Sequence, residues 1–193
     1  MSPNTHPEPL EQIFELNRLF LRFLQSRNLD EARRMGLPAS AADPLKAATP
    51  EQLDAAAEFP RGLFQLQLTD ANDASPMSYE SFPLPARILE MTIAYCAWST
   101  SRDSVYHARL FFGLGAEVIH TLRTTPLSEL PRLAMCHARV VCAFQEAEWL
   151  WRELLVETRP EARRQLVLVA LQPPLPSGRA FRRPAERIRG GRT

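Results

Sequence analysis

The cysteines and histidines that could ligate a metal or take part in catalysis are few and scattered. They are three cysteines and four histidines: Cys96, Cys136, Cys142, His6, His107, His120 and His137. Only Cys136 and His137 are neighbours, and adjacent side chains rarely converge on one ion. Cys142 follows six residues after Cys136, which leaves no fourth ligand at a suitable spacing. We therefore predict no metal site, no cofactor and no disulfide framework.

Motifs of an assembled active site are also missing from the sequence. The chain has only 7 glycines and lacks a G-x-S-x-G turn, a glycine-rich phosphate loop and an H-E-x-x-H helix. Four glutamates could line one helix face, namely Glu146, Glu148, Glu153 and Glu157. A charge run on an amphipathic helix is, however, typical of solvated surface. The sequence predicts a protein that is not an enzyme.

The basic residues are almost all arginines, since Lys46 is the only lysine among 23 basic side chains. Those that we expect to contact DNA phosphates lie in an early helical segment and in the C-terminal tail: Arg33, Arg34, Arg182, Arg183, Arg187 and Arg189. An arginine-rich tail adds sequence-independent affinity for nucleic acid that weakens with salt. The alternative is a solvated tail without a binding role.

Helices must position these residues. From Leu10 to Arg27, apolar residues recur at helical spacing and predict a long helix with a wide apolar face that another element must cover. Asn28 or Asp30 can cap a short helix that stops at Gly36.

Two further short helices and a strand follow. One helix is predicted over residues 39–47, and the next begins with Thr49 as N-cap and Pro50 as its first residue. Apolar and polar residues then alternate over 63–68, which favours a short strand or extended edge. A polar, proline-containing linker occupies residues 71–83.

The same plan recurs after the linker. A constant shift of 77 residues pairs Gly36 with Gly113, and Leu45 with Leu122, without a gap. A long apolar helix, a segment ending in glycine, two short helices and a hydrophobic stretch follow one another in both copies. We interpret this as an internal duplication.

Large apolar residues in both copies are candidates for packing between the modules or against a partner: Leu16, Phe20, Phe23, Trp149 and Trp151. Tryptophan is enriched at interface hot spots, but core packing is the commoner use of such residues. Cys142 lies in the apolar run VVCAF, where a buried inert thiol is favoured over an inter-chain disulfide.

The first copy contains IFELNRLFLRFL, EARRMGL, LKAATPEQLDAAA and LFQLQLTD, and the second contains LFFGLGAEVIHTLRTTPLSELPRLA and ARVVCAF. This succession resembles the FlhD family of flagellar transcriptional regulators, which commonly has a cysteine at the place of Cys142. The resemblance implies a mainly helical fold and self-association through the long helices. It also implies promoter activation together with a larger zinc-containing subunit, FlhC. The second copy departs from the family pattern, because it has Phe112 before its glycine where the first copy has the polar Arg34 ahead of Gly36.

We accordingly expect an all-α protein in which two FlhD-like modules form a covalent pseudo-dimer, with short extended segments at the module ends. The expected organisation is a disordered start, a first module, a linker, a second module with an extra C-terminal helix, and a disordered arginine-rich tail. The corresponding ranges are 1–9, 10–70, 71–83, 84–172 and 173–193.

The resemblance implies a transcriptional co-activator that acts on promoter DNA together with an FlhC-like subunit and controls flagellar or related genes. The internal duplication would reduce self-association. The alternative is a protein-interaction adaptor without DNA binding, such as a secretion regulator or chaperone. A signal-peptide pattern and the roughly 18 apolar residues of a membrane span are both missing, so we expect a cytoplasmic protein that does not enter the membrane.

Overall fold

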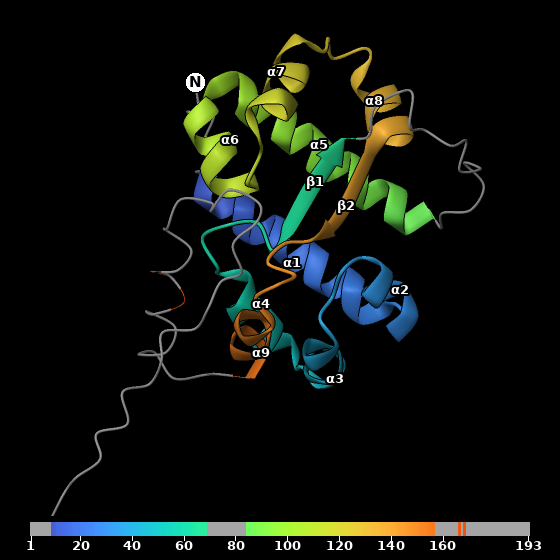
Figure 1. Cartoon of the computed structure of the whole chain (residues 1–193), viewed down its shortest axis with the longest axis vertical. Coiled ribbons are helices and arrows are strands. Elements are labelled where there is room, and N and C mark those ends of the chain that lie inside the picture. Colours follow the sequence, from blue (N-terminus) through green and yellow to red (C-terminus); the bar gives the residue numbers. More distant parts are fainter. Residues whose placement is uncertain (1–8, 69–83, 157–165, 167, 169–193) are drawn as a thin grey trace, which may run out of the picture.

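The computed structural model describes residues 9–68, 84–156, 166 and 168 (Figure 1). Within these residues the chain is mainly helical with one two-stranded sheet, which confirms the predicted all-α class. The elements before the linker are α1 (Pro9–Ser26), α2 (Leu29–Arg34), α3 (Ala39–Ala47), α4 (Pro50–Ala57) and β1 (Phe64–Leu68). Those after it are α5 (Leu84–Asp103), α6 (Val105–Phe112), α7 (Ala116–Thr124), α8 (Leu130–His137), β2 (Ala138–Cys142) and α9 (Glu148–Val156). None of the described helices is long and apolar enough to cross a membrane.

Capping residues begin α2 and α4, two of the three short helices of the first half, as the sequence predicts. The Asn28 side chain accepts a hydrogen bond from the backbone N–H of Glu31 and begins α2. Thr49 caps α4 in a reciprocal capping box with Gln52, and Pro50 is the first residue of that helix. Each cap satisfies backbone donors that a helix N-terminus otherwise leaves unpaired.

The second half repeats the element order of the first. In both halves a long helix is followed by three short helices and a five-residue strand. Gly36 follows α2 with φ +85° and Gly113 caps α6 with φ +64°, so both halves use glycine in the left-handed conformation. The helices α3 and α7 each have nine residues and begin 77 residues apart.

The shift of 77 residues does not hold beyond α7. The helix α4 begins directly after Thr49, whereas α8 begins at Leu130, five residues after Thr125 of the second Thr-Pro pair, which lies 76 rather than 77 residues after the first pair. Ser128 stands three residues after Thr125, where Gln52 completes the capping box of the first half. The Ser128 side chain is too short to repeat that reciprocal bond, and the Thr125 hydroxyl donates to the carbonyl of Thr121 in α7 instead. The helix α8 has no side-chain cap and runs directly into β2.

The strands β1 and β2 join the two halves. They pair antiparallel, with Phe64 opposite Cys142, Leu66 opposite Val140 and Leu68 opposite Ala138. Phe64 and Leu66 are buried while the intervening glutamines are exposed, which confirms the predicted period of two. Each half thus completes the sheet of the other.

Aromatic and helical packing also crosses between the halves. Phe20 of α1 and Phe112 of α6 both pack edge-to-face on Phe64 of β1, with ring centroids 5.7 Å and 6.0 Å away. The long helices α1 and α5 contact one another behind the sheet in the view of Figure 1. The core is continuous across the two halves.

The helix α9 packs against the first half, although it follows the second in sequence. It lies on α3 and α4, at the bottom of Figure 1. Ser40 of α3 donates a hydrogen bond to the carboxylate of Glu148 at the start of α9, over 3.1 Å. The extra C-terminal helix, which follows β2 of the second half, therefore contacts the first half.

Candidate functional site

The outer face of α5 carries a continuous row of exposed apolar side chains. Leu84, Ile88, Met91 and Tyr95, which we call the α5 stripe, are 70%, 57%, 38% and 51% exposed. Their spacing of four, three and four residues places them along one side of the helix. The opposite side carries Leu89, Ile93, Ala94 and Ala97, which are buried in the core. The helix is therefore apolar on two faces, of which the fold covers one.

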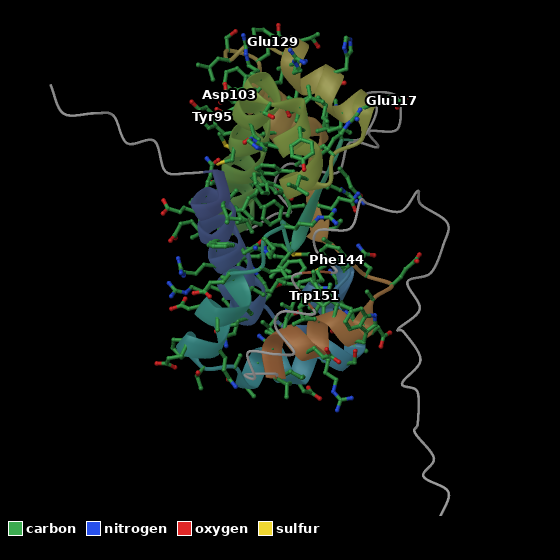
Figure 2. All side chains as sticks on the ribbon, turned by 90° about the vertical axis from the view of Figure 1, so that its left-hand side faces the viewer. Tyr95, Asp103, Glu117, Glu129, Phe144 and Trp151 are labelled. Atoms are coloured by element: carbon green, nitrogen blue, oxygen red, sulfur yellow. The ribbon has the colours of Figure 1, made fainter. Side chains whose placement is uncertain are left out.

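An ordered aromatic pair extends the stripe toward the end of α5. Tyr95 and Trp98 pack with their ring centroids 5.8 Å apart, and the guanidinium of Arg102 lies over the Trp98 ring at 5.0 Å. The Trp98 indole N–H donates to the carbonyl of Thr125 over 2.8 Å, which fixes the ring. Figure 2 shows Tyr95 and Asp103 along the same edge of the molecule. This end of the stripe is preorganised by its own contacts.

The inner flank of α5 carries a carboxyl group that ties the helix to β2. Burial raises the pKa of Glu90, against the opposing effects of a hydrogen bond with the Val140 backbone and the charges of Arg139 and Arg87. Because α5 also packs on α6, α7 and α8, the helix is held rigidly while its stripe faces outward.

The arginines expected to contact DNA are not gathered into one described site. Arg33 and Arg34 are exposed in the last turn of α2, in the half of the chain that does not carry the α5 stripe. Arg182, Arg183, Arg187 and Arg189 lie outside the described residues. Arg61, another basic residue near the repeated motif, is buried, with its guanidinium 5.3 Å from the centroid of the Phe144 ring.

The apolar residues singled out in the sequence mostly lie inside the molecule. Leu16, Phe20 and Trp151 are buried, and Phe20 packs on Phe64 of β1 within the first half. Trp151 also donates its indole N–H to the carbonyl of Ala143 over 2.9 Å. Phe23 and Trp149 are only partly buried against the core. These side chains belong to the core or pack against it, and it is the α5 stripe that faces outward.

The cysteines do not form a disulfide among themselves, because Cys96, Cys136 and Cys142 are all free thiols. Cys142 is fully buried opposite Phe64 in the sheet, and burial raises the pKa of its thiol far above the ordinary value. Among the described residues no group of three histidine, cysteine or acidic side chains could hold a metal ion.

Sequence reasoning missed two features that the structure reveals. The segment that forms α5 was recognised only as a second long apolar helix, although apolar residues on both of its faces signal a helix that needs two partners. The second feature is Asn17, a fully buried polar residue on the apolar face of α1. A polar residue within an apolar helical face was the signal that could have found it.

Comparisons with family models, with curated proteins and with solved structures give no match for this chain. The resemblance to FlhD therefore stays a prediction from the sequence motifs.

Proposed function

We propose that the chain is a non-enzymatic, FlhD-like transcriptional co-regulator that acts on promoter DNA together with a partner subunit. The observation that carries the proposal is the α5 stripe, which gives a partner helix a rigid apolar face. The repeated element order and the antiparallel pairing of β1 with β2 support the view that one chain replaces a dimer. The regulatory part of the proposal rests on the resemblance in sequence.

The partner that we infer is an FlhC-like subunit that places an amphipathic helix along α5. The spacing of the stripe matches the apolar positions of such a helix, and its aromatic end supplies a large, ordered contact area. Arg87 and Arg102 lie near the two ends of the stripe, so acidic residues beside the apolar positions of the partner would be complementary in charge.

Coexpression with the FlhC-like subunit of the same genome tests this proposal. Light scattering on the purified mixture should give the mass of a complex, and Ile88→Glu should weaken that complex at least about tenfold. Leu19→Glu is the matched control, because Leu19 is also an exposed leucine on a long helix but lies outside the stripe. A missing complex with the parent chain, or equal binding by Ile88→Glu, would refute it.

Self-association through the stripe is a separate outcome of the same measurement. A parent chain with twice its own mass, reduced to a monomer by Ile88→Glu, would assign the stripe to a second copy and overturn the inferred partner helix.

The second candidate is a protein-interaction adaptor without a DNA role, such as a secretion regulator or chaperone. The α5 stripe favours it equally, because a stripe of this kind needs only a protein partner. Fluorescence anisotropy with labelled promoter DNA separates the two functions. DNA binding by the complex supports the co-regulator, whereas a stable complex that does not bind DNA supports the adaptor.

A further inference from the structure

We propose that an open groove between α6 and α7 binds acidic peptide segments that also carry apolar side chains. The two helices are joined by a short turn, residues 113–115, and adjoin one another in the upper part of Figure 1. The groove between them has a volume of about 420 Å³. It is separate from the α5 stripe, and the proposal does not depend on a role in transcription.

Three cationic or titratable side chains line this groove. Arg109 comes from α6, and His120 and Arg123 come from α7. Neither arginine forms an ion pair within the described part of the chain, and both are exposed. Glu117, the acidic residue of α7, does not belong to the lining and lies at the edge of the molecule in Figure 2. The groove therefore presents positive charge that the described residues do not neutralise.

The groove also has apolar lining residues. Val105 lines it from α6, and Ala116 and Ile119 line it from α7, with Ile119 buried and Val105 partly buried. A ligand that fits both properties presents carboxylates to the arginines and apolar groups to these residues. An acidic peptide that alternates carboxylate and aliphatic side chains meets both requirements.

A nucleic-acid backbone fits this groove less well. Its contacts are phosphates and sugars, which leave the apolar lining without a matching group. Between residues 84 and 156, acidic and basic side chains are equal in number, so this half lacks the excess positive charge of a nucleic-acid footprint. The observations favour a peptide.

The first half does not repeat the two groove arginines at the equivalent positions. A shift of 77 residues places Ala32 at the position of Arg109 and Lys46 at that of Arg123. Ala32 is buried, and the Lys46 ammonium donates to the backbone carbonyls of Gln25 and Arg27 at the end of α1. The cationic lining thus distinguishes the second half from the first, and the two halves would bind different ligands.

A labelled peptide of alternating glutamate and leucine tests the proposal in a fluorescence anisotropy titration with the full chain. The parent chain should bind it, and added salt should weaken the binding. A lysine–leucine peptide of equal length should not bind. The double variant Arg109→Gln with Arg123→Gln should weaken binding of the acidic peptide at least about tenfold. Arg132→Gln is the matched control, because Arg132 is an exposed arginine on α8 outside the groove.

Ala116→Glu provides a second test that does not remove a cation. Ala116 is the exposed first residue of α7, where an acidic side chain favours the helix but places negative charge in the groove. This variant should retain the circular dichroism spectrum and the Tm of the parent while losing the acidic peptide.

Three results would overturn the inference: no binding of the acidic peptide up to millimolar chain, unchanged binding by both groove variants, or tighter arginine-dependent binding of double-stranded DNA. The last would assign the groove to nucleic acid instead.

Discussion

Replacement of Asn17 by leucine should destabilise the protein far more than any surface substitution. The side-chain amide of Asn17 donates to three backbone carbonyls, those of Ala57, Phe59 and Arg61, at 3.2, 3.0 and 2.9 Å. Its carbonyl oxygen accepts from the backbone N–H of Leu63 at 2.8 Å. One side chain on α1 thus holds the whole turn between α4 and β1.

The expected cost follows from these four contacts. A buried hydrogen bond contributes about 1 kcal/mol net, and a backbone group left unpaired in the interior costs about 1–3 kcal/mol. Asn17 is 0% exposed, so water cannot replace the lost partner without opening the core. Leucine has a similar volume and recovers part of the loss by apolar contact. We expect Asn17→Leu to lower the free energy of unfolding by about 3–5 kcal/mol.

Urea unfolding followed by circular dichroism and tryptophan fluorescence measures this loss. Gln12→Leu is the control on the same helix, because Gln12 makes only a 3.4 Å contact from its amide to the Cys96 sulfur. The control should stay within about 0.5 kcal/mol of the parent. A loss below about 1 kcal/mol for Asn17→Leu would refute the argument that buried backbone groups depend on this side chain.

Three further predictions concern other buried or strained positions. Burial raises the pKa of Glu90, so folding disfavours its charged form. Glu90→Gln should therefore raise the free energy of unfolding at about pH 7.5. This gain in stability should vanish below the ordinary carboxyl pKa, where the glutamate is protonated in both states. Urea titrations at several pH values check this, and a gain that does not change with pH would contradict it. Trp151→Phe should cost about 2–3 kcal/mol because it loses a hydrogen bond and core volume. Trp149→Phe should cost less than about 1 kcal/mol, since its buried indole N–H has no acceptor among the described residues, and equal costs in thermal unfolding would exclude this explanation. Gly36→Ala should lower the free energy of unfolding by about 1–2 kcal/mol because φ is +85° there. Gly115→Ala should be nearly neutral, since Gly115 has φ −70° and open space around it. Similar losses of Tm in the two variants would argue against backbone strain at Gly36.

The local signals in the sequence predict individual elements well. Asn28, Thr49 and Pro50 mark helix starts through backbone capping, which depends only on neighbouring residues. The alternation over residues 64–68 predicts a strand for the same reason. The repeated plan also predicts a helix after the second Thr-Pro pair, and the structure has α8 there, beginning at Leu130 without a side-chain cap.

Contacts between distant segments could not be predicted in the same way. The pairing of Leu66 with Val140 and the packing of α9 on α3 join residues far apart in the chain, and no local pattern specifies them. The helix α5 is apolar on two faces, and the exposure of the α5 stripe depends on which of the two faces the fold covers. The α6–α7 groove likewise exists only because the turn at residues 113–115 brings Arg109 and Arg123 to one cavity.

A DNA-binding titration with the chain, the FlhC-like subunit of the same genome, and their equimolar mixture tests the proposed co-regulator most directly. Fluorescence anisotropy of labelled promoter DNA reports binding. The mixture should raise the anisotropy at a protein concentration at least about tenfold lower than either protein needs alone. Light scattering of that complex should show that a single copy of this chain takes the place of a dimer of one-module subunits. DNA binding by the mixture no tighter than by the separate proteins would contradict the proposed co-regulator.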